Sequence, residues 1–353
     1  MSTATLFEPN ITESENVVAS VPAATAKPKL AFVGVGWIGR NRLQAAVDSG
    51  LAEVTLISDP SEQCLEEAGK IVPGCKTTQS FEEILADPAV DAVVIATPSA
   101  LHKQQAVQAF EHNKAVFCQK PLGRDGTEVH AVVWAATKAN RLLGADFSYR
   151  YTAAWQAILP ILHSGELGNI FSVDLTFHNA YGPDKPWFYN MNQSGGGCVL
   201  DLGIHLVDLM LVGLQFPAVD KVDSRLYAKG TPVKGKNEVE DFAAVTMDLA
   251  NGTVAKLNCS WNLQAGQEAV IEATFYGTNG GVTMRNINGS FYDFEAARFW
   301  GTKTEVLASP PDAWGGRALV KWIEQLSSSN AFNEQAKEYL QSAEILDRIY
   351  GRK

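Results

Sequence analysis

Leu30-Ala-Phe-Val33, followed directly by Gly34-Val-Gly36-Trp-Ile-Gly39, is the stretch that decides the fold of this 353-residue chain. The apolar part has the composition of a buried parallel strand, and the glycine-rich part matches the pattern G-x-G-x-x-G. Residues 38–49 then have the character of a helix, and Gly50 stands where a helix-ending glycine is expected. A glycine-rich turn between a buried strand and a helix predicts a site for the pyrophosphate of a dinucleotide.

Each residue of this fingerprint has an expected place at the dinucleotide. Gly34 permits a tight turn, Gly36 lets the pyrophosphate approach the backbone, and Gly39 lets helix and strand pack closely. Trp37 and Ile38 open the helix, whose free N–H groups and positive end favour a phosphate. We therefore predict that all five residues belong to the cofactor site.

Asp59 follows the next apolar run and lies 20 residues after Gly39. An acid at this place can accept hydrogen bonds from both hydroxyls of an adenosine ribose, and it repels a 2′-phosphate. No arginine follows within the next several residues. The sequence therefore predicts NAD rather than NADP, although a simple Asp-Pro turn would satisfy the same pattern.

Strand-like and helix-like segments alternate as far as residue 147. The expected strands lie at 30–33, 54–57, 92–95 and 115–118, and the expected helices at 38–49, 61–71, 80–86, 99–113 and 126–141. Strands separated by such helices need crossover connections. Residues 29–147 are therefore predicted to form an α/β domain, a Rossmann doubly wound parallel sheet that binds NAD(P).

The pattern changes after residue 147, where strand-like segments follow one another. A helix is expected at 153–163, strands at 170–178, 221–227, 242–249, 253–260 and 269–276, and a last helix at 333–350. Short turns such as Asn251-Gly252 indicate antiparallel pairing. Residues 148–353 are thus predicted to be a C-terminal α+β domain for substrate and oligomerisation, with a largely antiparallel open sheet.

Composition and the first residues exclude several classes of protein. Residues 1–28 predict a flexible tail, or an arm on another subunit, and not a signal peptide. No run of about eighteen apolar residues is present, so no membrane span is expected. The net charge of −10 disfavours nucleic acid and anionic membranes. Five cysteines without a C-x-x-C pair predict free thiols in a cytoplasmic protein.

Two polar segments follow predicted strands of the first domain. Ala96-Thr97-Pro98 with His102 follows one strand, and Gln119-Lys120-Pro121 follows the next. Ligands bind at the carboxyl ends of strands in open α/β sheets, so both segments are candidates for the site. A solvated loop lysine is the alternative interpretation of Lys120.

A third segment, Gly195 to Asp208, lies in the second domain. If it is helical, Asp201, His205 and Asp208 stand at i, i+4 and i+7 on one face. Polar groups in such an apolar helix need partners. A structural histidine and a metal pair are the alternatives, but no third ligand is evident, so we expect no metal.

Taken together, these motifs resemble the glucose–fructose oxidoreductase / inositol dehydrogenase / rhizopine-catabolism (Gfo/Idh/MocA) family. The likeness covers about residues 29–350. It is carried by the glycine fingerprint, Asp87 to Pro98 with His102, Gln119-Lys120-Pro121 in place of Glu-Lys-Pro, Ser164 to Ile170, and Gly195 to Asp208.

The resemblance implies roles for individual residues. Lys120 would contact the nicotinamide ribose and the substrate hydroxyl, His205 would be the general acid/base, and Asp201 would bind and orient the substrate. Thr97, Pro98, His102 and Gln119 would line the cofactor. The chemistry is consistent, because a histidine suits proton transfer at neutral pH and an ammonium stabilises a developing alkoxide. Gln119 lacks the charge of the family's glutamate, so a retuned site is expected.

The substrate is expected to be polyhydroxylated. Tyr181 and Trp187 lie in an aromatic and polar cluster that matches the polar edges and apolar faces of sugars and cyclitols, and Arg150 stands where the family often has arginine. We predict an NAD-dependent dehydrogenase or reductase of a sugar, sugar derivative or cyclitol. By analogy it is a homodimer or homotetramer. An NAD-assisted glycoside hydrolase and a non-catalytic sugar sensor are the alternatives.

Overall fold

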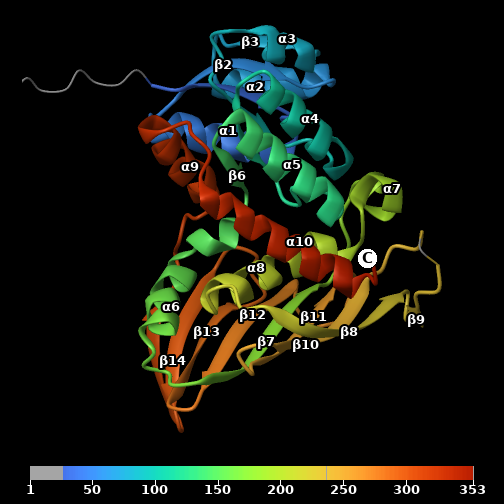
Figure 1. Cartoon of the computed structure of the whole chain (residues 1–353), viewed down its shortest axis with the longest axis vertical. Helices are drawn as coiled ribbons and strands as arrows, with labels where there is room; N and C mark the ends of the chain where they lie inside the picture. Colours follow the sequence, from blue (N-terminus) through green and yellow to red (C-terminus); the bar gives the residue numbers. More distant parts are fainter. Residues whose placement is uncertain (1–26, 236, 353) are drawn as a thin grey trace, which may run out of the picture.

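The computed structural model describes residues 27–352 except residue 236, so the predicted tail lies almost wholly outside the described residues. Figure 1 shows the first domain above a large second sheet, with helix α10 (Glu338–Ile349) running between them. Side chains of α10 join the hydrophobic cores of both domains: Ala343 packs with the first, and Ile345, Leu346 and Ile349 with the second.

The first domain is the predicted doubly wound fold. Its described strands form a six-stranded parallel sheet in the order β3-β2-β1-β4-β5-β6, with a hydrophobic core on each face. The strands are β1 (Lys29–Val33), β2 (Glu53–Ser58), β3 (Lys76–Thr78), β4 (Ala92–Ile95), β5 (Ala115–Cys118) and β6 (Leu143–Ala145). The helices are α1 (Trp37–Ser49), α2 (Glu62–Ile71), α3 (Phe81–Ala86), α4 (Ser99–Glu111) and α5 (Gly126–Ala139).

Local signals explain most of these boundaries. Gly50 ends α1 in the left-handed region, with φ +62°, and the Ser61 hydroxyl accepts a hydrogen bond from the Cys64 N–H to cap α2. At the start of α3 the Ser80 hydroxyl does not cap the helix, because it donates to Glu82. Strands β3 and β6 are only three residues long, which is too short for a periodic pattern to reveal.

The second domain is built on a nine-stranded sheet within the described residues. Its order is β15-β14-β13-β12-β7-β11-β10-β8-β9, and only the β7–β11 pair is parallel, so the predicted, largely antiparallel sheet is confirmed. The strands are β7 (Ile170–Asn179), β8 (Val219–Ala228), β9 (Thr231–Pro232), β10 (Phe242–Leu249), β11 (Val254–Ser260), β12 (Ala269–Gly277), β13 (Gly280–Asn286), β14 (Phe294–Trp300) and β15 (Lys303–Ala308).

Two helices, α6 (Ala153–Ser164) and α8 (Ile204–Gly213), pack against this sheet. Together with α7 (Met191–Ser194) and the π-helix η3 (Val199–Gly203), α8 forms a helical stretch from Met191 to Gly213. By length and composition this stretch could cross a membrane, but 89 % of its apolar 18-residue window is buried inside the protein. It is the core helix of the second domain, and it carries Asp201 and His205.

Helix α9 (Arg317–Ser328) follows the second sheet but packs on the first domain. Its residues Leu319, Trp322 and Ile323 pack into the first domain's core beside β1 and β5. A side chain at Gly144 in β6 would collide with Trp322, since a Cβ there would lie 2.4 Å from Trp322 Cδ1. The chain therefore returns to the first domain after the second sheet.

Candidate active site

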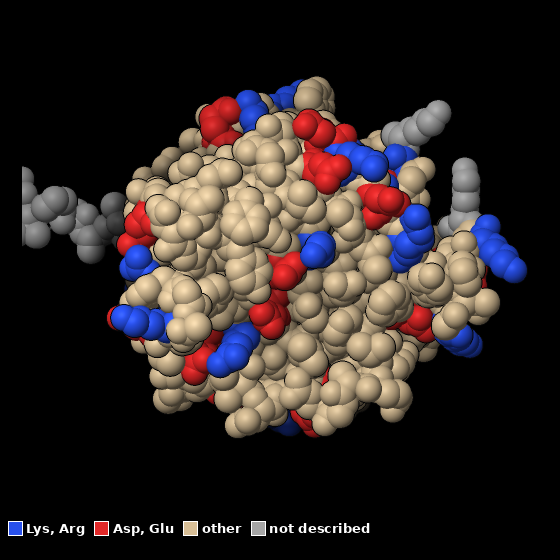
Figure 2. Space-filling model, turned by 90° about the horizontal axis from the view of Figure 1, so that it is seen from below, with Lys and Arg blue, Asp and Glu red and all other residues tan. Residues whose placement is uncertain are grey.

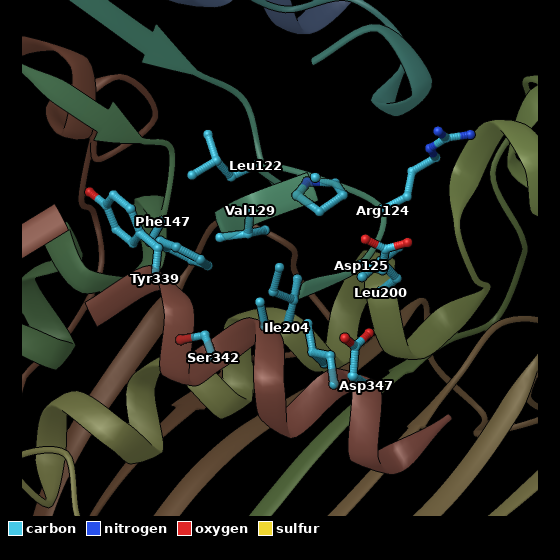
Figure 3. Close-up of a pocket in the computed structure, with 14 residues that line it drawn as sticks. Leu122, Arg124, Asp125, Val129, Phe147, Leu200, Ile204, Tyr339, Ser342 and Asp347 are labelled. Carbon is cyan, nitrogen blue, oxygen red and sulfur yellow. The ribbon is translucent and has the colours of Figure 1, made fainter. Parts of the chain in front are cut away.

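A cavity of about 1020 Å³ lies where the carboxyl ends of the first domain's strands face α8 and its preceding π-helix. Both domains supply its walls. A second cavity, of about 20 Å³, lies between α10 and the first domain and is lined by Leu122, Val129, Ile204 and Leu346 (Figure 3). It has room for little more than one water molecule, so the large cavity is the candidate site.

The glycine fingerprint forms one end of the large cavity. Gly34 has φ +81°, and a Cβ there would lie 2.6 Å from the Ala96 backbone. A Cβ at Gly39 would lie 2.1 Å from the Gly34 carbonyl oxygen, so helix and strand pack closely as expected. At Gly36 the space is open for 4 Å around. The open backbone at the start of α1 fits the pyrophosphate of a dinucleotide.

Asp59 lies at the same end, and its carboxylate is held in place by the backbone. Oδ2 accepts a hydrogen bond from the Val35 N–H at 2.8 Å, and Oδ1 accepts one from the Ser61 N–H at 2.9 Å. Each oxygen keeps a lone pair for a ribose hydroxyl. Arg40 forms an ion pair with Glu67 at 2.8 Å and is not among the residues that line the cavity. A ribose without a 2′-phosphate fits this end best.

The other predicted cofactor residues, Trp37, Ile38, Thr97, Pro98, His102, Gln119 and Lys120, also line the cavity. His102 is buried, and its two ring nitrogens lie 2.7 Å from the carbonyl oxygens of Thr97 and Pro121. Burial lowers its pKa. His102 therefore joins the two loops that follow β4 and β5, and its polar atoms face the protein.

Lys120 and Asp201 meet across the domain junction. The Lys120 ammonium donates to Asp201 Oδ1 and to the Asp201 carbonyl oxygen, both at 2.7 Å. Trp261 donates to Asp201 Oδ2 at 3.1 Å through its indole nitrogen. The anionic partner of Lys120 is thus Asp201 from the second domain, and Gln119 donates instead to Asp146.

His205 lies beside this pair and is almost fully buried, with 7 % of its surface exposed. The rings of Tyr149 and His205 pack edge to face, with 4.7 Å between their centroids. The Nδ1 of His205 has no hydrogen-bond partner among the described residues. Burial, and then the charges of Lys120 and Arg42, lower the His205 pKa well below 6.5. The imidazole is therefore neutral at pH 7, as a proton acceptor must be.

Glu240 positions the helical stretch that carries these groups, and the sequence analysis missed it. Its buried carboxylate accepts hydrogen bonds from the Gly197 and Val199 N–H groups and, at 2.7 Å, from the Tyr350 hydroxyl. Side chains at Gly196 and Gly197 would collide with Tyr350 and with the Glu240 backbone. The glycine triplet is therefore required by packing. The turn that follows is a π-helix, so the predicted α-helical spacing begins only at Ile204.

Two predicted substrate-binding residues do not line the cavity. Arg150 forms a buried bidentate ion pair with Asp208, at 2.7 and 2.5 Å. This pairing engages the guanidinium away from the cavity lining, and the predicted role of Arg150 in substrate binding stays a prediction. Tyr181 is 51 % exposed and is not a lining residue, although it packs against Phe291, which does line the cavity.

Trp187 does line the cavity, together with aromatic residues that the sequence analysis did not select: Tyr149, Phe188, Phe291, Tyr292 and Trp314. The last three come from the segment after β13, more than 100 positions beyond Trp187. No local sequence pattern predicts that this segment returns to the site.

Each cation of the cavity lining has an acidic partner, whereas Asp59 has no cationic partner among the described residues. Of the described lining residues, the cations are Arg42, Lys120 and Lys185, and they pair with Asp146, Asp201 and Asp184. Among residues 27–352 apart from 236, no group of three or more His, Cys, Asp or Glu side chains could hold a metal ion. The described cysteines are all free thiols.

Comparisons with known proteins agree with this geometry. Residues 29–147 match the model of an oxidoreductase family with an NAD-binding Rossmann fold, and residues 155–283 match the GFO/IDH/MocA C-terminal domain. The chain is 27 % identical over 259 residues to 1,5-anhydro-D-fructose reductase of Ensifer adhaerens, which is 72 % of this chain and 75 % of that protein. It is 26 % identical over 311 residues to D-apiose dehydrogenase of Paraburkholderia graminis, which is 88 % of this chain and 80 % of that protein.

Solved structures share the fold. Levoglucosan dehydrogenase in complex with NADH and levoglucosan is similar with a TM-score of 0.78 and 21 % identity, over 92 % of this chain and 96 % of that one. GenD2 from gentamicin A biosynthesis, in complex with NAD, has a TM-score of 0.78 and 22 % identity, over 95 % and 97 %. With both domains matched in order, the chain belongs to the Gfo/Idh/MocA family of NAD-binding oxidoreductases.

Proposed function

We propose that this oxidoreductase interconverts a hydroxyl and a carbonyl group on an uncharged sugar, sugar derivative or cyclitol, with NAD as its cofactor. One observation carries the proposal: Lys120, Asp201 and His205 come together from two domains at a cavity whose other end has the open glycine turn and Asp59. Bound NAD supplies the hydride acceptor or donor.

The chain's own residues supply binding and proton transfer. Gly36 and the start of α1 hold the pyrophosphate, and Asp59 holds the adenosine ribose. His205 takes the proton of the substrate hydroxyl, and the Lys120 ammonium stabilises the negative charge that develops on the oxygen. Asp201 orients Lys120 and accepts a hydrogen bond from the substrate.

Paired charges support an uncharged substrate. Each described cation of the lining has an aspartate partner, so a phosphate or carboxylate on the substrate would have to compete with that partner. Aromatic side chains such as Trp187 and Trp314 instead offer apolar surface for the C–H faces of a ring. Three related enzymes are named for uncharged sugars, which supports the same class, whereas a fourth is named for glucose 6-phosphate.

Glucose and glucose 6-phosphate form a matched pair that tests this preference. We expect kcat/KM for the phosphorylated sugar to be lower by about tenfold or more, because its charge stays unpaired in the cavity. Equal values would contradict the charge argument. If glucose is not a substrate, the same comparison applies to an inositol and its monophosphate.

Asp59→Ala should weaken NAD binding and relax the selection against NADP. The carboxylate accepts from the ribose hydroxyls and repels a 2′-phosphate, so its removal affects the two cofactors in opposite directions. We expect the ratio of the two dissociation constants to change by about tenfold or more. Asp48→Asn, an exposed change on α1, is the control. An unchanged ratio would remove Asp59 from cofactor selection.

A homodimer or homotetramer in the cytoplasm completes the proposal. Figure 2 views the molecule from the side of the second sheet, where broad areas carry neither Lys or Arg nor Asp or Glu. Such a face suits contact with a second copy of the chain. The free thiols support a reducing compartment. Light scattering of the purified protein tests the assembly.

A further inference from the structure

Two loops of the second domain, residues 180–190 and 287–293, contribute exposed side chains to the wall of the large cavity. They follow β7 and β13, and both strands pair with β12, so the loops leave the sheet at the same end. Within the second loop the Ser290 hydroxyl donates to Asp293 Oδ2 at 2.9 Å, and the Asn286 amide nitrogen donates to the Ser290 carbonyl oxygen at 2.9 Å. The loop 287–293 therefore has a defined shape without a ligand.

Tyr292 brings an exposed aromatic ring into this wall. It lines the cavity, yet 58 % of its surface is exposed. Phe291 lines the cavity beside it, and the exposed Tyr181 packs on Phe291 with 6.0 Å between the ring centroids. We call Tyr181, Phe291 and Tyr292 the aromatic rim. Adjoining apolar surfaces that stay exposed in this way are typical of binding sites.

Two further rings connect the aromatic rim to the reaction centre. Tyr149 packs edge to face on His205, and the ring of Trp314 lies 5.1 Å from that of Tyr149 between centroids. The Trp314 indole nitrogen donates to the Tyr292 carbonyl oxygen at 2.9 Å. Burial raises the pKa of Tyr149, and the nearby Asp201 and Tyr292 raise it further. Tyr292 thus lies close to Tyr149, between the reaction centre and the surface.

We propose that the aromatic rim is a subsite for a second sugar ring, so that the substrate is a glycoside with at least two rings. The inference rests on the proposed function in placing the reacting ring beside Lys120 and His205. A second ring linked to it would reach the rim. There the apolar C–H face of a pyranose buries apolar surface against the aromatic side chains, and its hydroxyl groups stay in water at the open side of the cavity.

Calorimetric titration of the protein saturated with NADH tests this subsite without turnover, because a methyl glycoside has no carbonyl group that NADH could reduce. The probes are three pairs that differ by one ring: methyl α-glucoside and methyl α-maltoside, methyl β-glucoside and methyl β-cellobioside, methyl β-galactoside and methyl β-lactoside. In at least one pair we expect the two-ring glycoside to bind about tenfold or more tightly, because its second ring buries apolar surface. Equal affinities, or no binding, in all three pairs would overturn the proposal.

Tyr292→Ala should lower the ratio of these affinities toward one. Affinity for the two-ring glycoside should fall by about tenfold or more, and affinity for its one-ring partner should change little. Tyr292→Phe keeps the ring face and should keep the wild-type ratio. Tyr181→Ala, at an exposed position of the rim, should lower the ratio as well. If Tyr292→Ala retains the wild-type ratio, the rim does not bind the second ring.

Trp134→Ala is the control for these variants. It removes an exposed aromatic ring from α5 in the first domain, and it should leave both affinities as they are. Phenyl β-glucoside provides a further comparison, because its second ring is aromatic. A gain in affinity for this compound alone would show that the rim binds an aryl group, and it would overturn the assignment to a sugar.

Two more measurements separate the subsite from other roles of the aromatic rim. If Tyr292→Ala lowers the molecular mass in light scattering while the ratio of affinities stays, the rim is a contact between copies of the chain and the proposal fails. NADH formation tests the proposed function by itself. Turnover of single-ring sugars without any gain from a second ring would overturn the subsite alone. Tighter binding of a two-ring glycoside without NADH formation from any sugar would overturn the proposed function and leave the subsite standing.

Discussion

Lys120→Ala is expected to lower turnover by about 10²–10³-fold, because it removes the cation that stabilises the developing alkoxide. The residue is held by Asp201 at 2.7 Å, so the ammonium is already in place before substrate binds. NAD affinity should fall far less than turnover, since the glycine turn and Asp59 remain. Steady-state kinetics and cofactor titration on the same preparation measure both effects.

The control for this variant is Lys138→Ala. Lys138 lies on the exposed side of α5, next to Trp134 and away from the cavity. It should retain wild-type turnover. Near-wild-type turnover in Lys120→Ala would remove this lysine from the mechanism.

His205→Asn should lower turnover by about 10²–10⁴-fold, which is the usual contribution of a positioned general base. Asparagine keeps a polar side chain of smaller size but cannot take up the proton at neutral pH. His130→Asn, at an exposed position of α5, is the matched control. If the two asparagine variants turn over at similar rates, His205 is not the base.

The pH profile gives an independent test of His205. Its pKa is lowered well below 6.5, first by burial and then by Lys120 and Arg42, so it stays unprotonated until the pH falls below that value. We expect the acid limb of kcat/KM for oxidation to lie below pH 6.5. In the unfolded chain His205 binds a proton near pH 6.5, whereas in the folded protein it binds one only at lower pH. The free energy of unfolding therefore decreases as the pH falls below 6.5. An acid limb at or above pH 6.5 would contradict the neutral, buried imidazole.

The first domain could be predicted from the sequence because its signals are local. A buried strand, a glycine turn and a helix lie within 21 residues between Lys29 and Ser49. The cofactor end of the site shares this property, since Asp59 lies at the end of the next strand. Lys120 could be placed for the same reason, since it directly follows β5.

Features that depend on distant segments could not be predicted. Helix α9 packs on the first domain although it follows the second sheet, and the aromatic wall at Tyr292 and Trp314 enters the site from the same region. Asp146 lies next to the predicted boundary, but only the fold brings it to Arg42. The ion pair of Arg150 could not be predicted, because its partner Asp208 lies 58 positions away.

The most direct test of the central claim is the absorbance of reduced nicotinamide when the protein is mixed with NAD⁺ and a panel of uncharged sugars, glycosides and inositols. The account predicts that at least one member of the panel gives steady NADH formation and a ketone or lactone product, and that Lys120→Ala and His205→Asn abolish both. No NADH with any member, or release of a free sugar from a glycoside without net reduction of NAD⁺, would contradict it.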